Sequence, residues 1–350
     1  MVIDMASIQR VASYEDYQVR FNRSGRHGGR RIFLSILRKL FGCGCTPLPG
    51  RLIKVDEIHL HIDCRGQGEV ALLLEAGLGM DSTGWSLIHD PLSKHARVCA
   101  YDRAGMGWSE PISRLSLAVD ISKRLQRLLD EAGESGPYIL VGMSAGGVLV
   151  REYYKQYPEN VVGMVLVDSS HEQQNHRLPD LGRGFDYRLL ACRIFQPIGL
   201  ARLYGQLEEV RPTTMSDEWV STSVANQNKS HACNSFYYAF ESFMQEVVDP
   251  LPPSSLGELP LLVLSQGNEP KGDLAAGYTD EMAKKQRRIW DELQIELTQL
   301  SSSSTRVIAK QSGHVIQFHQ PELVIESILQ LIEGLSGGVV LEKMESDADS

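Results

Sequence analysis

The sequence predicts an α/β fold, in which a mainly parallel, doubly wound sheet carries an inserted helical cap. The first observation behind this prediction is an alternation of short apolar runs with segments of helical periodicity, between residues 51 and 168 and again between 259 and 335. Such alternation is typical of chains that cover both faces of a parallel sheet with helices. The second observation is a stretch of ninety residues, 169–258, without a buried-strand run. It is too long for a loop, so we expect it to form the cap.

The expected elements follow in chain order. Segments 52–55 and 59–64 are separated by a short polar turn, which predicts an antiparallel pair. The later strands are continuous apolar runs, as expected for strands buried on both faces; they occupy 70–74, 96–101, 138–141, 161–167, 259–266 and 306–310. Helices are expected over 84–95, 115–132, 145–157, 280–300 and 321–335.

Composition narrows the class of protein. The chain has 350 residues, of which 42% are hydrophobic and 23% charged, as in ordinary globular proteins, so one large domain with an insertion fits best. Its 35 basic and 44 acidic residues give a net charge of -9, which argues against nucleic acid as a partner. The six cysteines lack metal-ligand spacing, and the chain does not open with a signal peptide. We therefore expect reduced thiols and a cytoplasmic protein.

Residues 1–50 form an arm outside the expected sheet, and 336–350 an acidic tail that we expect to be disordered. Between Asp16 and Asp56 there is no acidic residue, while seven basic residues gather in the arm: Arg20, Arg23, Arg26, Arg30, Arg31, Arg38 and Lys39. Within it, 30–41 has an apolar helical face, and Cys43 and Cys45 follow as possible palmitoylation sites. Residues 20–45 are therefore either a peripheral membrane contact or a helix that packs on the main domain.

A catalytic pattern follows the strand 138–141. The motif Gly142-Met-Ser144-Ala-Gly146 lies between this strand and a helix, as in a nucleophile elbow. The sharp turn strains the backbone at Ser144, and glycines two residues away on each side leave room for it. The helix then directs its free N–H groups toward the serine, where negative charge develops during acyl transfer. Ser144 is the predicted nucleophile.

A serine hydroxyl needs a base within hydrogen-bonding reach, and an acid that orients the base. His314 follows the last expected strand, in Ser312-Gly313-His314, and is the predicted base. His319, five residues further on, is the rival histidine.

The elbow, the turn at 77–79, the loop at 102–109 and the Gly313-His314 loop occur in an order that resembles the α/β-hydrolase superfamily, over about residues 50–335. This resemblance implies an α/β-hydrolase fold, with core segments 51–168 and 259–335 around the cap 169–258. The superfamily includes esterases, lipases, thioesterases, peptidases, epoxide hydrolases, dehalogenases and non-catalytic receptors. A serine at 144 speaks against the epoxide hydrolase and dehalogenase branches, whose nucleophile is a carboxylate.

The resemblance also implies the oxyanion hole. Its two donors are the backbone N–H of Ala145, directly after the nucleophile, and that of Leu78, in the turn after an earlier strand. The histidine that the family usually has in this turn is missing, because the sequence reads Glu75-Ala76-Gly77. Since the donors are backbone groups, this departure leaves the expectation intact.

Two carboxylates compete for the role of the acid. Glu269 lies just beyond the strand 259–266, where the family usually keeps this residue, although glutamate is a less frequent choice there. Asp168 lies at the end of 161–167, a position that some lipases and dehalogenases of the superfamily use. Asp273 is a third, more distant candidate.

These features predict a serine hydrolase that cleaves carboxylic esters or thioesters through an acyl-enzyme. The aromatic and aliphatic residues of 169–258 favour lipophilic substrates. No metal or organic cofactor is implied. The alternatives are a slowly turning over ligand-sensing receptor of the same fold, a peptidase or amidase, and a catalytically inactive scaffold; the oligomeric state stays open.

Overall fold

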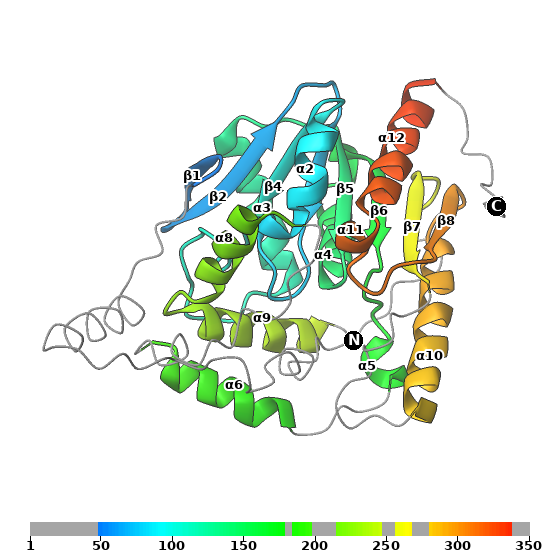
Figure 1. The fold of residues 1–350 in the computed structure, drawn as a ribbon. Coiled ribbons are helices and arrows are strands. Elements are labelled where there is room, and N and C mark those ends of the chain that lie inside the picture. Colours follow the sequence, from blue (N-terminus) through cyan, green and yellow to red (C-terminus); the bar gives the residue numbers. More distant parts are fainter. Residues whose placement is uncertain (1–47, 179–183, 198–214, 247–255, 268–279, 338–350) are drawn as a thin grey trace, which may run out of the picture.

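An eight-stranded sheet forms the centre of the computed structural model (Figure 1). The structure describes residues 48–178, 184–197, 215–246, 256–267 and 280–337. The strands are β1 (Arg51–Val55), β2 (Ile58–Arg65), β3 (Ala71–Glu75), β4 (Arg97–Tyr101), β5 (Tyr138–Met143), β6 (Val161–Val167), β7 (Leu261–Gln266) and β8 (Ser304–Ala309).

The strand order is β1-β2-β4-β3-β5-β6-β7-β8. Only the first two pairings, β1 with β2 and β2 with β4, are antiparallel, and all later neighbours pair in parallel. The prediction of a mainly parallel sheet is thereby confirmed. The parallel connections cross over through helices, as parallel strands require.

Helices cover both faces of the sheet (Figure 1). Besides two 3-10 turns, η2 (Ser82–Trp85) and η3 (Pro158–Asn160), the helices that flank the sheet are α2 (Ser86–Ser93), α3 (Ala118–Ala132), α4 (Ala145–Gln156), α10 (Asp280–Thr298), α11 (Ile316–His319) and α12 (Pro321–Gly337).

The central strands contribute side chains to both layers. In β3, Leu73 packs with residues of α3, α4 and α10, whereas Leu72 and Leu74 pack with residues of α2, α11 and α12. In β5, Leu140 packs in the same layer as Leu73, and its neighbour Ile139 packs in the same layer as Leu72 and Leu74. Successive side chains of a strand point to opposite faces, so a strand between two helical layers must be apolar throughout. This explains the continuous apolar runs in the sequence.

The described elements between β6 and β7 are all helices: α5 (Gln174–Arg177), α6 (Gly184–Phe195), α8 (Asp217–Gln227) and α9 (Ala232–Glu246). Of these, α9 lies against the turn that follows β3, because a Cβ atom added to Gly79 would be only 2.7 Å from the Phe236 ring. Helix α8 reaches the core as well, since Asn226 donates from its amide to the Asp81 carboxylate at 2.9 Å. These helices therefore lie close to the region of the predicted oxyanion turn.

Two helix starts differ from the sequence prediction. The helix expected from residue 84 begins earlier, as the 3-10 turn η2, because the Asp81 carboxylate caps it by accepting from the Thr83 N–H at 3.0 Å. The helix expected from residue 115 begins only at Ala118, after Leu117 in an extended conformation. Leu115 and Leu117 are exposed and lie outside the helix. Their apolar side chains extended the helical periodicity of the sequence by three residues beyond the true start.

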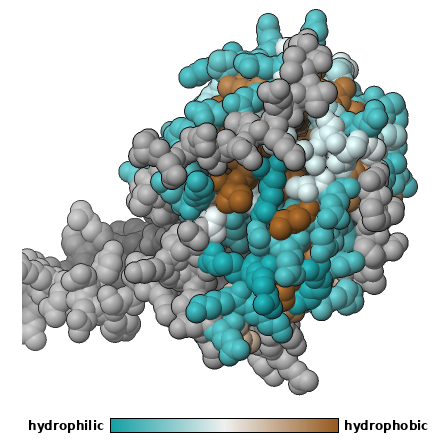
Figure 2. Space-filling model, turned by 90° about the vertical axis from the view of Figure 1, so that its right-hand side faces the viewer, coloured by the Kyte–Doolittle hydropathy of each residue, from teal (hydrophilic) through white to brown (hydrophobic). Residues whose placement is uncertain are grey.

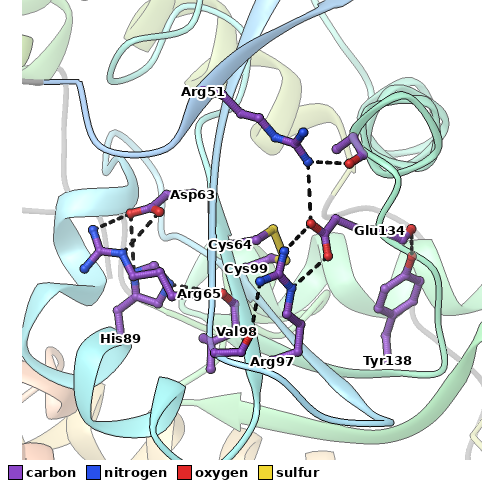
Figure 3. Close-up of a disulfide and its surroundings, with 12 residues drawn as sticks. Arg51, Asp63, Cys64, Arg65, His89, Arg97, Val98, Cys99, Glu134 and Tyr138 are labelled. Atoms are coloured by element: carbon purple, nitrogen blue, oxygen red, sulfur yellow. Dashed lines mark hydrogen bonds and ion pairs between the residues drawn. A yellow bond between two sulfur atoms is a disulfide. The ribbon is translucent and has the colours of Figure 1, made fainter.

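The expectation of reduced thiols is contradicted for four cysteines. Disulfides join Cys64 to Cys99 and Cys192 to Cys233. The first pair lies directly opposite across β2 and β4, with a Cα–Cα distance of 4.0 Å (Figure 3). The partners are 35 and 41 residues apart in sequence, so only the tertiary fold brings them together.

Ion pairs surround the first disulfide. The Arg97 guanidinium donates to both carboxylate oxygens of Glu134, and this contact raises the pKa of Arg97 (Figure 3). Arg51 approaches the same carboxylate at 3.6 Å from β1. These contacts tie β1 and β4 to the segment just after α3.

The basic arm up to residue 47 and the tail from residue 338 lie outside the described residues. Within the described part, no helix has both the length and the apolar composition needed to cross a bilayer. From the side of β8 and α10, Figure 2 shows small hydrophobic patches among hydrophilic residues. The exposed Ile295 of α10 and Ile308 of β8 are two of the hydrophobic residues on the molecular surface.

Candidate active site

Ser144 lies at the sharp turn between β5 and α4, with φ 52° and ψ -123°. A positive φ is costly for a residue with a side chain, and it persists only where the surroundings hold it. Here the Ser144 N–H donates to the Val167 carbonyl at 3.1 Å, and its own carbonyl accepts from the Ser170 N–H at 2.9 Å. The end of β6 and the loop after it therefore hold the turn in place.

The two glycines of the motif are required by close backbone contacts. A Cβ atom on Gly142 would be 2.7 Å from the Gly146 carbonyl oxygen, and one on Gly146 would be 2.4 Å from that of Glu75. Real Cβ atoms essentially never come so close. The sequence therefore allows β5, the start of α4 and the end of β3 to meet around Ser144.

His314 and Asp168 form a buried pair. The Nδ1 atom of His314 lies 2.6 Å from Oδ2 of Asp168, and the two side chains are 6% and 0% exposed. A carboxylate only accepts hydrogen bonds, so Nδ1 carries the proton and Nε2 of the neutral imidazole is left as an acceptor. This Nε2 is buried and has no hydrogen-bond partner in the described part of the chain. The histidine is thus in the tautomer that a general base requires.

The second oxygen of Asp168 is also satisfied. Oδ1 accepts from the Trp290 Nε1 and from the Gln266 N–H, both at 3.0 Å. The Trp290 ring, from α10, also packs edge-on against the His314 ring, with centroids 5.7 Å apart. Trp290 thus orients both members of the pair. Sequence reasoning missed it, because a tryptophan on an amphipathic helix looks like an ordinary core residue.

The turn after β3 reaches Ser144. A Cβ atom on Gly77 would be 3.4 Å from that of Ser144, so Gly77 lies beside the predicted nucleophile. Ala145 is the first residue of α4, where backbone N–H groups have no partner within the helix. The two expected oxyanion donors, Leu78 and Ala145, therefore both come from segments that border the serine.

Arg103 stabilises this turn through hydrogen bonds to its backbone. Its guanidinium donates to the carbonyl oxygens of Ala76 and Gly77, both at 2.6 Å, and to the carboxylate of Glu75. Tyr101 donates its hydroxyl to the same carboxylate. Burial raises the pKa of Glu75, against the opposite influence of Arg103 and Tyr101. Glu75 stands in the turn from which the family's histidine is missing, and here it anchors the arginine.

A second buried arginine supports the loop after β6. Arg151 of α4 donates to the Glu172 carboxylate at 2.8 and 3.0 Å, to the Ser169 hydroxyl at 2.9 Å and to the Ser170 carbonyl at 2.9 Å. Because this loop begins at Asp168, the network fixes the carboxylate that faces His314. The same loop explains Gly147, since a Cβ atom there would collide with the Ser169 hydroxyl.

Three candidates from the sequence remain: His319, Glu269 and Asp273. The rival His319 is exposed, and its Nδ1 is 3.2 Å from the Ser312 hydroxyl. Glu269 and Asp273 lie outside the described residues. Of the carboxylates weighed from the sequence, the structure brings Asp168 to the histidine.

One group of potential metal ligands occurs among the described residues. Cys64, Cys99 and Glu134 have ligand atoms within 4.8 Å of one another. Both sulfurs are joined in the disulfide, however, and therefore cannot serve as thiolate ligands.

The fold and the elbow define a class of protein, and comparison with known proteins agrees with it. A family model described as the alpha/beta hydrolase fold matches residues 70–195. An AB hydrolase superfamily protein of Gibberella zeae is 24% identical over 279 residues, which cover 75% of this chain and 85% of that protein. The chain therefore has the α/β-hydrolase fold, and it is similar in sequence to proteins of that superfamily.

Two further relatives are longer proteins. A probable transporter of Hormonema carpetanum, efuK, is 28% identical over 281 residues, and an uncharacterised protein of Schizosaccharomyces pombe is 26% identical over 292. The matches cover 77% and 71% of this chain but only 40% and 52% of those proteins. The chain thus spans about half the length of these relatives.

Solved structures share the fold at low sequence identity. A probable hydrolytic enzyme of Pseudomonas aeruginosa has a TM-score of 0.60 at 20% identity, covering 82% of this chain and 95% of that one. A thermophilic esterase of Thermogutta terrifontis has a TM-score of 0.56 at 18% identity, covering 81% and 98%. An epoxide hydrolase has a TM-score of 0.58 at 16% identity, covering 81% and 98%.

Proposed function

We propose that the protein is a serine hydrolase that cleaves carboxylic ester or thioester bonds through an acyl-enzyme. One observation carries this proposal: Ser144 occupies a strained elbow whose N–H bonds to Val167, and the next residue, Asp168, orients a buried histidine whose Nε2 has no partner among the described residues. Among the similar folds are both an esterase and epoxide hydrolases. A serine at the elbow favours acyl transfer over epoxide opening, because a base-activated serine hydroxyl attacks a carbonyl carbon, whereas the epoxide hydrolases of the superfamily use a carboxylate nucleophile.

In the proposed reaction, His314 Nε2 takes the proton from Ser144 as its oxygen attacks the carbonyl carbon. The negative charge that develops on the carbonyl oxygen is stabilised by the N–H groups of Leu78 and Ala145. His314 then passes the proton to the departing alcohol or thiol, and the acyl group stays on Ser144. Water, deprotonated by His314, attacks the acyl-enzyme and releases the acid.

Arg103 is a positioning residue in this mechanism. Its contacts with the Ala76 and Gly77 carbonyls fix the plane of the peptide whose N–H belongs to Leu78. A donation to the Gly77 carbonyl also polarises that peptide, which strengthens its N–H as a donor. The oxyanion donor is thus held by Arg103 and, through it, by Glu75.

Lipophilic substrates fit the surroundings of the turn. Phe236 lies against Gly79, and Phe240 stacks near it at a ring distance of 6.4 Å. Both rings are only partly buried, so they offer apolar surface beside the oxyanion turn. A series of p-nitrophenyl esters tests this point. We expect kcat/KM to rise from acetate to medium acyl chains, and a steady fall with length contradicts the preference.

Ester hydrolysis by substituted proteins tests the proposed function itself. Ser144→Ala removes the nucleophile and little volume, so it should abolish hydrolysis while the protein stays folded. Ser122→Ala is the matched control, because Ser122 is buried in α3 and its hydroxyl has no hydrogen-bond partner in the described residues. Undiminished hydrolysis by folded Ser144→Ala would overturn the proposal.

A further inference from the structure

A small cavity lies behind the oxyanion turn, between the loop after β4, the start of α3 and the helix α9. Its volume is about 40 Å³, and no acidic residue lines it. The polar side chains around it are those of Arg103, Arg114, Ser116, Arg124, Ser235, Tyr238 and Ser242. In a chain with a net charge of -9, three arginines around one cavity are a local excess of positive charge.

Arg124 has no ion pair within the described part of the chain. Its side chain is buried on α3, with 8% of the residue exposed, and its only hydrogen bond in the described residues is a long one, 3.5 Å to the Ser116 hydroxyl. Burial lowers the pKa of Arg124, and the nearby Arg114 lowers it further. The charges of Asp56 and Asp120 act in the opposite direction, but Asp56 is itself paired with Arg127 at 2.8 Å.

The other buried arginines of the protein show what is missing here. Arg151 donates to a carboxylate, a hydroxyl and a carbonyl, and Arg103 donates to a carboxylate and two carbonyls. A buried cation without such partners is destabilising, since its desolvation is not compensated. Most N–H donors of Arg124 therefore have no acceptor among the described residues. Arg114 is exposed and has no ion pair there either.

We propose that this cavity is a binding site for an oxyanion, the phosphate or carboxylate group of a small molecule, held by Arg124 and Arg114. Guanidinium groups bind such anions with short, charge-assisted hydrogen bonds. The Tyr238 hydroxyl, which also lines the cavity, adds a neutral donor. The site adjoins the proposed catalytic centre, because Arg103 lines it while donating to the turn carbonyls.

Thermal unfolding in inorganic phosphate tests this proposal, with sodium chloride at matched ionic strength as the reference. We expect millimolar phosphate to raise the midpoint of the wild-type protein along a saturating curve, because a ligand that binds only the folded state stabilises it. Phosphate also stabilises proteins by exclusion from their surface, but that effect does not saturate. A parallel titration with acetate distinguishes the two sources: whichever anion saturates at the lower concentration identifies the group that the site prefers.

Substitutions at the two arginines make the test specific. Arg124→Met should abolish the saturable response and raise the midpoint in chloride, because it removes an uncompensated buried cation. Arg114→Met, at an exposed position, should weaken phosphate binding by about tenfold or more. Lys123→Met is the matched control on the same helix; it changes the net charge equally and should leave the response intact. The site is overturned if the wild type shows no saturable response, or if Arg124→Met and Arg114→Met respond to phosphate as the wild type does.

Discussion

Among the described residues, two buried histidine–aspartate pairs have Nδ1–Oδ2 distances below 3 Å, and they differ at the second ring nitrogen. In both, the histidine Nδ1 faces an aspartate Oδ2, at 2.6 Å for His314 and Asp168 and at 2.8 Å for His61 and Asp102. In the first pair Nε2 has no partner in the described residues, whereas Nε2 of His61 lies 2.7 Å from the Pro49 carbonyl oxygen. A carbonyl only accepts, so this nitrogen must donate, and His61 has no free acceptor for a substrate proton.

The surroundings of the two aspartates support the same distinction. Asp102 accepts from the backbone N–H groups of Ser82 and Trp108, at 2.7 and 2.9 Å, and thereby fastens the loop after β4. Burial would lower the pKa of His61, but the hydrogen bond and charge of Asp102, with help from Pro49, raise it. A buried His–Asp pair alone therefore does not identify a general base; its second ring nitrogen must also be free to accept a proton.

Replacing the two histidines gives the largest expected contrast. His314→Gln should lower kcat for a p-nitrophenyl ester on the order of 10⁶-fold, because it removes the general base. His61→Gln should lower the thermal midpoint and leave kcat of the folded protein almost unchanged. Circular dichroism melts alongside the kinetics separate these effects. A comparable loss of kcat in both variants would show that the distinction is wrong.

The aspartates should follow the same rule with a smaller effect. Asp168→Asn should lower kcat by about 10⁴-fold, because an amide holds the histidine in the wrong tautomer. Asp102→Asn should act on stability instead, since that carboxylate fastens a loop. Steady-state kinetics of both folded variants provide the measurement, and nearly unchanged activity in Asp168→Asn argues against Asp168 as the acid.

Arg103→Met sharpens the comparison at the oxyanion turn. Arg103 positions the peptide of the proposed oxyanion donor but is not itself the donor. Its loss should therefore lower kcat by at most about 10²-fold, the smallest effect expected when a donor is lost outright, with little change in KM. Binding of a trifluoromethyl ketone, which mimics the tetrahedral intermediate, should weaken in parallel. Arg127→Met on α3 is the control. A loss confined to thermal stability leaves Arg103 with a structural role only.

The sequence predicted the sheet and the elbow because both depend on local patterns. Apolar runs mark strands buried on two faces, and the glycines around Ser144 mark a turn that few other residues allow. Which carboxylate meets His314 depends instead on how two distant strand ends approach, so Asp168 and Glu269 could not be separated. Arg103 and Glu75 both stand in motifs that the sequence shows, but their contact could not be predicted, because it depends on how the ends of β3 and β4 approach each other. The disulfide between Cys64 and Cys99 depends on strand register in the same way.

The smallest effect concerns the pH dependence of stability. The folded-state pKa of His61 is raised above its value in the unfolded chain, so its protonation stabilises the fold below the unfolded pKa of 6.5. This contribution is lost as the pH rises through the folded-state pKa. The difference in thermal midpoint between wild type and His61→Gln should therefore shrink from pH 6 to pH 9. A difference that grows over this range contradicts the direction of the shift.

Covalent labelling tests the central claim most directly. A fluorophosphonate reacts with an activated serine, and peptide mass spectrometry then locates the adduct. We expect one adduct per chain, on Ser144, which is absent in Ser144→Ala, slowed severely in His314→Gln and formed at the normal rate in His61→Gln. An adduct on another residue, or labelling of Ser144 that is equally fast in folded His314→Gln, would contradict a nucleophile activated by the His314–Asp168 pair.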